Sequence, residues 1–162
     1  MGTGEGSALS SYRMKDAVGF YLLLQLVFLG AYLSLAAALW GKLPATIAVH
    51  FKSSGTPDIF LDKLWGVLGL PALVWLLPFV LTLLAKNSEF SLRMRIYPGK
   101  IKAWAELMTL MIAGVIVVMS TAVLYNARLT SGKAVSYAGV LLIAAVLMGI
   151  YRLITGGVDG RV

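Results

Sequence analysis

The chain has 162 residues, of which 59% are hydrophobic and only 13% are charged, and its net charge is +7. A composition this apolar excludes an ordinary soluble domain and predicts an integral membrane protein. The sequence contains no cysteine, which excludes a disulfide framework and a thiolate metal site.

Four apolar runs are each long enough to cross about 30 Å of hydrocarbon as a helix, which takes roughly 20 residues. They predict membrane spans at about 17–39, 64–85, 105–126 and 134–152, with connecting loops at 40–63 and 86–104. These spans use most of the chain, so we expect a single membrane domain over residues 1–162. The predicted fold class is an all-α integral membrane protein with four transmembrane helices and a structured loop between the first two.

The residues before the first run read MGTGEGS and predict a short flexible tail. Arg13 and Lys15 before the run, and Ala36-Ala37-Ala38 within it, resemble the flanks of a secretory signal peptide. The apolar run is too long for a signal, whose apolar region has about 7–15 residues. We therefore interpret it as a retained transmembrane helix.

Polar side chains inside the predicted spans are few. Gln25 is the one amide near the middle of a span, and no acidic, basic or histidine residue lies at mid-depth. Transport paths usually carry such residues. We expect Gln25 to make an interhelical hydrogen bond, with contact to a transported substrate as the alternative. Pro71 and Pro78 fall inside the second span and predict a bend there.

The 40–63 loop is the most polar and most patterned stretch of the chain. Residues 46–51 alternate and include β-branched side chains, which predicts a short extended segment. Residues 52–58 are rich in turn formers, and residues 59–61 are apolar, which favours a re-entrant or surface-lying piece. Asp62 is suited to cap the next helix. We expect an ordered loop.

His50 is the only histidine, and with Asp58 or Asp62 it forms the loop's only pair suited to proton transfer. One histidine and two aspartates are a poor match to a metal site of three or four ligands. We therefore expect no catalytic residue, cofactor or metal. The favoured interpretation places the ring under the turn, bonded to a backbone carbonyl or to Asp58. A pH-sensing role is a further hypothesis, since an unperturbed histidine has a pKa of about 6.5.

The distribution of Lys and Arg predicts the orientation. With the N-terminus inside, nine of the 14 basic residues lie on the inner side, and five on the outer. The positive-inside rule then places both termini in the cytoplasm and the 40–63 loop outside the cell membrane. The basic residues are scattered among short loops, which argues against nucleic acid as a partner. The basic 86–104 loop is expected on the inner leaflet, with membrane lipids as partners.

One set of residues in the 40–63 loop resembles a known signature. Leu43-Pro44, Ile47, His50-Phe51, Gly55, Pro57-Asp58 and Lys63 are similar to the hallmark of the SdpI-type membrane proteins, a family built on a domain of unknown function. The resemblance covers residues of about 20–85. Ala48 departs from it, because the family commonly has proline there. The resemblance implies a recognition or structural element made of Pro44, His50, Phe51, Gly55, Pro57, Asp58 and Lys63.

Three functions follow as hypotheses. The family's namesake acts in immunity to a secreted peptide toxin and in signalling, so the resemblance implies a non-enzymatic receptor, immunity or sensor protein that uses the outer loop. Its partner would be a protein or an extracellular peptide. The alternatives are an accessory subunit of a larger membrane complex, or a small transporter that would need an oligomer to enclose a path.

Overall fold

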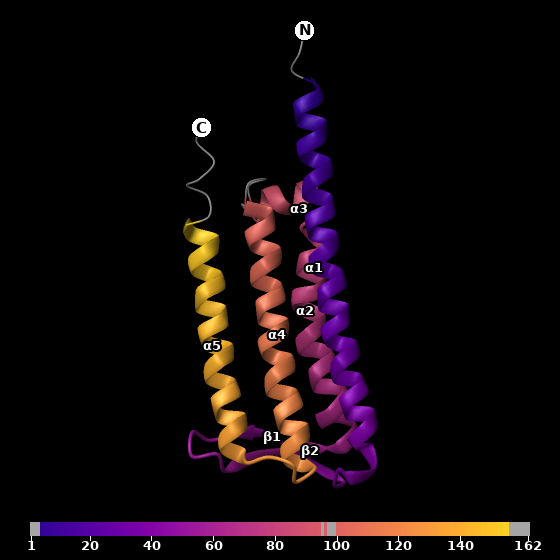
Figure 1. Cartoon of the computed structure of the whole chain (residues 1–162), viewed down its shortest axis with the longest axis vertical. Helices are drawn as coiled ribbons and strands as arrows, with labels where there is room; N and C mark the ends of the chain where they lie inside the picture. Colours follow the sequence, from indigo (N-terminus) through magenta and orange to yellow (C-terminus); the bar gives the residue numbers. More distant parts are fainter. Residues whose placement is uncertain (1–3, 95, 97–99, 156–162) are drawn as a thin grey trace.

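The computed structural model describes residues 4–94, 96 and 100–155, with side chains from residue 18 onward except at 88 and 92. Long helices dominate it, and a two-stranded sheet lies at one end (Figure 1). In chain order the elements are α1 (Gly4–Leu39), a short 3₁₀ turn (Trp40–Lys42), β1 (Thr46–Phe51), β2 (Pro57–Asp62), a π-helical turn (Trp65–Gly69), α2 (Leu70–Leu84), α3 (Ser88–Arg93), α4 (Ile101–Asn126) and α5 (Gly132–Thr155).

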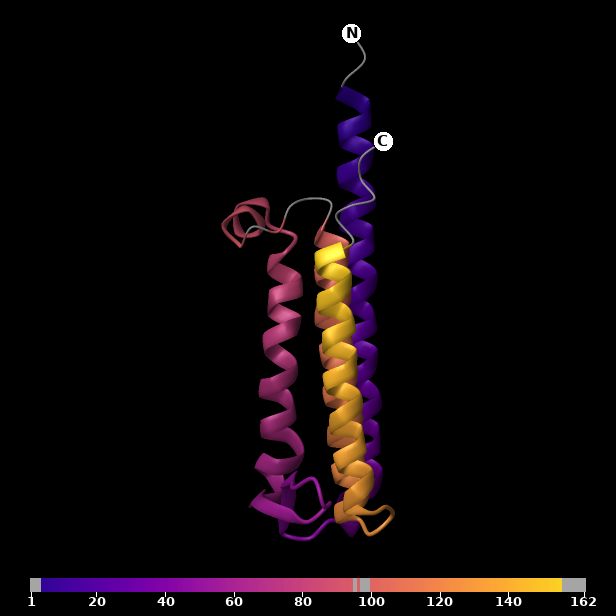
Figure 2. The ribbon, with the colours of Figure 1, turned by 90° about the vertical axis from the view of Figure 1, so that its left-hand side faces the viewer.

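Four helices are long and apolar enough to cross a membrane, which confirms the predicted fold class. These candidate spans are Val18–Lys42, Trp65–Leu84, Ile101–Asn126 and Gly132–Thr155. The helix α4 packs against α1, α2 and α5. The hairpin of β1 and β2 lies at one end of this bundle, and the start of α1 and the end of α5 lie at the other (Figures 1 and 2). The chain is a multi-pass membrane protein.

The regions that flank the spans contain more helix than the sequence predicted. The tail was expected to be flexible, but α1 begins at Gly4 and extends past the other helices (Figure 1). Extending a helix that is already formed in the span avoids the cost of a new nucleus and gains one hydrogen bond for each residue added. The expected 86–104 loop likewise contains α3 and the first turn of α4. Arg95 and residues 97–99 of this loop lie outside the described residues.

The second span begins with a π-helical turn, Trp65–Gly69, which ends two residues before Pro71. Pro71 has no N–H to donate to the carbonyl four residues earlier, which is that of Val67. The buried hydroxyl of Tyr32 on α1 donates to this carbonyl at 2.6 Å. A neighbouring helix thus supplies a donor where proline cannot.

Gln25 joins three helices at mid-depth. Its side chain is fully buried, and Nε2 donates to the hydroxyls of Thr82 at 3.0 Å and Thr109 at 2.9 Å. Those hydroxyls donate in turn to the carbonyls of Pro78 and Ala105 in their own helices. Gln25 therefore makes interhelical hydrogen bonds to both α2 and α4, where the sequence suggested one.

The main core cluster reaches from the helices into the sheet. Ile47 of β1 is 1% exposed and packs in the same cluster as Tyr32, Val67 and Ile112. Burying a side chain of this size stabilises the fold by about 1.5–3 kcal/mol. The sheet is therefore packed onto the bundle as part of its core.

Candidate functional site

The 40–63 loop folds into an antiparallel hairpin. Thr46 pairs with Asp62 and Ile47 with Leu61, and the register shifts on both sides of His50. The turn is closed by two backbone hydrogen bonds, from Lys52 to Thr56 at 2.9 Å and from Gly55 to Lys52 at 2.8 Å. The extended segment predicted at 46–51 is β1.

Residues 59–61 were expected to be a re-entrant or surface-lying piece, and in the structure they form a largely exposed strand. They lie in β2, where the backbone of Ile59, Phe60 and Leu61 pairs with β1. The preceding turn reverses the chain so that these residues meet the edge of β1, and their backbone groups find hydrogen-bond partners there. Apolar composition alone did not reveal this partner.

His50 and Asp58 form a pair across the hairpin. Nδ1 of His50 lies 2.5 Å from Oδ1 of Asp58, and the two side chains are 58% and 29% exposed. The ring is thus bonded to Asp58, as one alternative held, but it is exposed and not placed beneath the turn. An ionised carboxylate only accepts hydrogen bonds, so Nδ1 carries the proton in this pair. The carboxylate therefore orients the imidazole on the exposed surface.

Lys63 caps the C-terminal end of the first membrane span. Its ammonium donates to the carbonyls of Trp40 at 2.6 Å and Leu43 at 3.2 Å, and it lies 4.6 Å from the centre of the Trp40 ring. A cation at a helix C-terminus satisfies carbonyls that have no partner within the helix. Next to it, Oδ1 of Asp62 accepts a hydrogen bond from the N–H of Leu64. Lys63 therefore joins α1 to the hairpin.

The side chain of Asn126 holds the backbone of β1 at Ala48. Its Oδ1 accepts from the Ala48 N–H and its Nδ2 donates to the Ala48 carbonyl, both at 2.9 Å. Ala48 is 1% exposed, so these backbone groups need partners. A proline here, which the resemblance implied, would have no N–H to donate to Asn126. Next to Asn126, Tyr125 packs edge-on against Phe51, with ring centres 4.9 Å apart.

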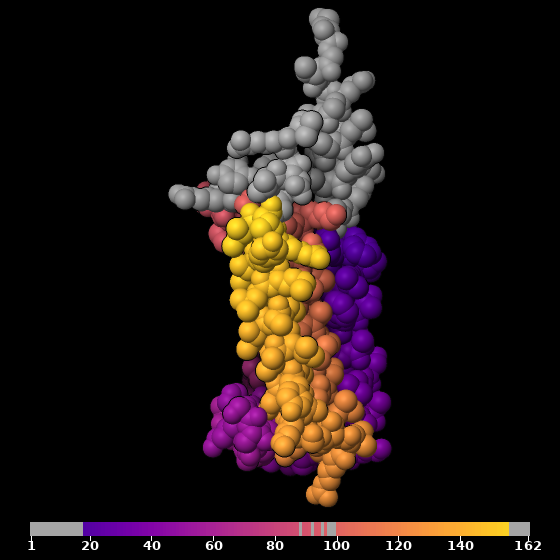
Figure 3. All heavy atoms as spheres, turned by 60° about the vertical axis from the view of Figure 1, so that its left-hand side comes forward, coloured from indigo at the N-terminus to yellow at the C-terminus, as the bar shows by residue number. Residues whose placement is uncertain are grey.

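The tip of the hairpin packs against the start of α5, as Figure 3 shows near the base of that helix. Gly55 has a φ of 84°, and a Cβ there would lie 2.5 Å from the backbone nitrogen of Lys133. A Cβ on Gly132 would lie 1.9 Å from the carbonyl oxygen of Gly55. Ser136 on α5 also donates to the carbonyl of Lys52 at 2.9 Å. Only glycine fits at this backbone contact.

Three attachment residues were missed by the sequence analysis: Asn126, Gly132 and Ser136. Each lies at the hairpin end of α4 or α5, far along the chain from the loop it holds. The available signals were weak, because an amide at the end of a span and a glycine at a helix start each have ordinary local roles.

The seven residues singled out from the sequence do not share one cleft. Phe51, Gly55 and Lys63 attach the hairpin to the helices, whereas His50 and Asp58 form the exposed pair. Pro57 begins β2, and Pro44 is exposed in the connection between the 3₁₀ turn and β1. Within the described part of the chain, no three His, Cys, Asp or Glu residues are grouped as metal ligands would be.

The exposed surface of the hairpin is partly apolar. Ile59 is 50% exposed and Phe60 is 55% exposed, and both lie on β2. The sheet has two strands, so in the described structure β2 pairs with β1 alone. The backbone at the outer edge of an edge strand is available to pair with a further strand.

Comparison with known proteins identifies a family for part of the chain. The model of a family described as a domain of unknown function, DUF1648, matches residues 27–75. No curated protein and no solved structure matches. DUF1648 is found in SdpI-like membrane proteins, and the matched segment runs from the middle of α1 through the hairpin into α2. The chain is therefore a multi-pass membrane protein in which residues 27–75 match the DUF1648 domain.

Proposed function

We propose that the chain is a non-enzymatic protein of the cell membrane whose hairpin recognises a partner outside the cell, in a receptor, immunity or sensing role. The main support for the proposal is that the hairpin is fixed to the bundle, whereas the His50–Asp58 pair on it is exposed. Asn126, Gly132 and Lys63 provide the attachment, and His50 and Asp58 form the exposed pair.

Attachment to the helices supports recognition because it orders the binding surface in advance. Ordering loops and side chains on binding costs about 0.5–1.5 kcal/mol for each side chain immobilised. The contacts of Asn126 and Gly132 hold the hairpin backbone at both its middle and its tip. A partner would therefore meet a strand that is already extended and an imidazole that is already oriented.

The partner class that fits best is an extended extracellular peptide. An edge strand binds such a peptide by adding it as a further strand, with side-chain contacts giving specificity. The edge strand β2 offers Ile59 and Phe60 for apolar contacts. Asp58 with His50 offers a polar contact near the turn.

Selection of peptides from a random library on the protein in nanodiscs tests the proposal. We expect enriched peptides that bind the wild-type chain and lose at least tenfold in affinity on Phe60→Ser or on the double change His50→Ala, Asp58→Ala. A matched double change at the opposite end, Lys86→Ala with Glu89→Ala, should leave binding unchanged. Peptides that bind equally to all variants, or a selection without enrichment, would contradict recognition by the hairpin.

A second proposal, an accessory subunit of a larger membrane complex, is supported by α5. It is the least buried of the four spans, and large apolar side chains such as Tyr137, Leu141 and Met148 are exposed along it. A partner helix would cover this surface as readily as lipid does. Purification from native membranes decides between the two proposals. A partner at fixed stoichiometry that survives the Phe60→Ser change would favour the subunit.

A further inference from the structure

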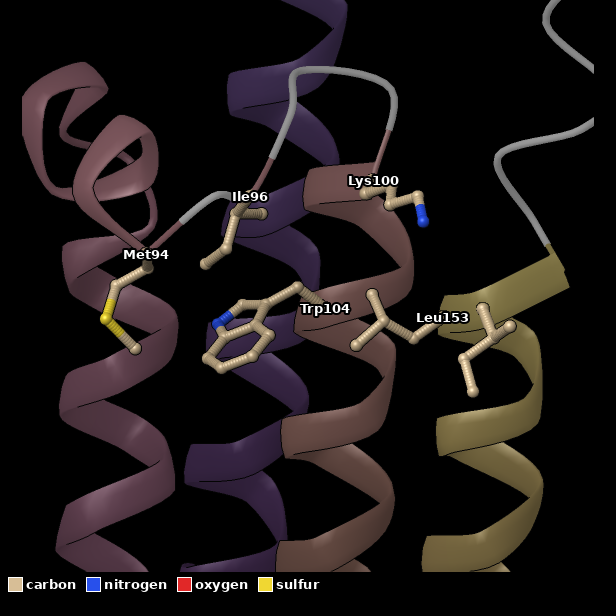
Figure 4. Close-up of a pocket in the computed structure, with 6 residues that line it drawn as sticks. Met94, Ile96, Lys100, Trp104 and Leu153 are labelled. Atoms are coloured by element: carbon tan, nitrogen blue, oxygen red, sulfur yellow. The ribbon is translucent and has the colours of Figure 1, made fainter.

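A cavity of about 280 Å³ lies at the end of the bundle opposite the hairpin (Figure 4). It lies where Met94 and Ile96, which follow α3, and the start of α4 meet the last turn of α5. Its lining residues are Met94, Ile96, Lys100, Trp104, Leu153 and Ile154. Four of these side chains are apolar, and the two others, Lys100 and Trp104, carry hydrogen-bond donors.

At this cavity the indole N–H of Trp104 is a buried donor without an acceptor among the described residues. Figure 4 shows the indole reaching from α4 toward Met94, with Ile96 above it. An indole N–H is a donor only, and buried donors in folded proteins are almost always paired. The site therefore calls for an acceptor that this part of the chain does not supply.

The charge around the cavity favours an acceptor that is negative. Lys100 stands at the start of α4 and lines the cavity, and an ammonium group is also a donor only. Lys102 is exposed one turn or less away. The carboxylate of Glu106 is paired with Arg152 of α5, and Glu106 is not among the residues that line the cavity.

We propose that this cavity binds the headgroup region of an anionic phospholipid from the surrounding leaflet. The phosphate is held by Lys100, an oxygen of the phosphate or of an acyl ester accepts from the Trp104 indole, and an acyl chain continues along Leu153 and Ile154. Met94 is 49% exposed and Ile154 is 67% exposed, so the apolar rim faces the surroundings of the bundle. Tryptophan and lysine at a span end are the usual headgroup neighbours in membranes.

Two features favour a membrane lipid, and not a free phosphate, as the ligand. The apolar wall matches acyl chains, which a free phosphate does not have, and the cavity lies at the ends of membrane spans. The predicted orientation places it at the inner leaflet, whose anionic lipids attract basic residues. The inference depends on membrane insertion and not on the function proposed for the hairpin.

Native mass spectrometry of the full chain tests the site with phosphatidylglycerol and phosphatidylcholine as probes. We expect one phosphatidylglycerol retained per chain and weaker retention of phosphatidylcholine. Lys100→Gln should reduce phosphatidylglycerol affinity about fivefold, which corresponds to about 1 kcal/mol for one basic residue. Trp104→Phe, which keeps the ring and removes the N–H, should reduce it further when combined with Lys100→Gln.

Two control variants separate the site from general attraction to the membrane. Lys133→Gln and Trp65→Phe change the same residue types at the hairpin end and should leave retention unchanged. Equal retention of the two lipids, or no effect of Trp104→Phe and Lys100→Gln in a chain that still folds, would overturn the proposal. Soluble glycerol phosphate is the third probe. If it binds as tightly as the lipid, the acyl chain contributes nothing and a lipid site is excluded.

Discussion

Asn126 shows how one side chain can fix a loop that lies far from it in sequence. Its amide matches both the backbone donor and the backbone acceptor of one residue of β1, Ala48, and it also donates to the carbonyl of Ala122 in its own helix. Asparagine carries its donor and its acceptor on two separate atoms, so it can bond to an N–H and a carbonyl of the same residue at once. The position of β1 against α4 depends on this contact.

We predict that Asn126→Leu detaches the middle of β1. The change keeps the approximate size and leaves the N–H and carbonyl of Ala48 unpaired in a buried place, at a cost of about 1–3 kcal/mol. Amide hydrogen exchange over residues 46–51 should then be faster. Asn87→Leu, at an exposed asparagine that bonds to the start of α3, is the control and should leave this exchange unchanged. Unaltered exchange in Asn126→Leu would show that packing of Ile47 alone holds the strand.

Gln25 permits a test of its structural role against the transport hypothesis. Gln25→Leu removes the hydrogen bonds to Thr82 and Thr109, and such bonds inside membrane bundles contribute about 0.6 kcal/mol each on average. We therefore expect a modest loss of stability, about 1 kcal/mol, measured by unfolding in mixed micelles. Thr121→Ala, whose hydroxyl bonds only to its own helix, should have a smaller effect. A stable Gln25→Leu protein that loses a flux across liposomes would instead support a transport path.

At the scale of elements, the contact between the hairpin and α5 depends on two glycines. Gly132→Ala places a Cβ against the carbonyl of Gly55, and Gly55→Ala adds the strain of a positive φ, about 1–2 kcal/mol. We predict that each change frees the turn at 52–56, seen as faster amide exchange there. Gly139→Ala is the matched control on α5, because a Cβ there meets nothing within 4 Å. The same exchange rate in Gly132→Ala and Gly139→Ala would contradict a fixed tip.

The sequence predicted the helices better than the loop for a physical reason. Four apolar runs must form helices to satisfy their backbone in a membrane, so length and composition determine them. The second strand depends on a partner, and residues 59–61 carry no signal that distinguishes pairing with β1 from lying on a surface. The roles of Asn126 and Gly132 could not be predicted for the same reason. They arise only from the packing of α4 and α5 against the hairpin.

The candidate site was predicted only in part. The seven residues chosen from the resemblance all lie between the first two spans, and they include the exposed pair of His50 and Asp58. What they do differs from residue to residue, because Lys63 bonds to backbone carbonyls and Gly55 contacts another backbone. The residue types located the structured element between the first two spans. They did not show which of the seven residues attach the hairpin to the helices and which are exposed.

At the scale of the whole molecule, the segment that matches the family is not a separate structural unit. The DUF1648 match ends at residue 75, yet the hairpin within it is held by Asn126, Gly132 and Ser136. The matched segment therefore depends on helices outside the match for its shape. The last two helices serve as the support on which the hairpin is built.

The proposed recognition role requires the hairpin to face outward, and the absence of cysteine allows a direct measurement of its side. Single cysteines at Ser54, in the hairpin turn, and at Asn87, between α2 and α3, would be labelled with a membrane-impermeant maleimide in intact cells. We predict that Ser54→Cys is labelled at once and that Asn87→Cys is labelled only after permeabilisation. The reverse pattern would place the hairpin in the cytoplasm and contradict recognition of an extracellular partner.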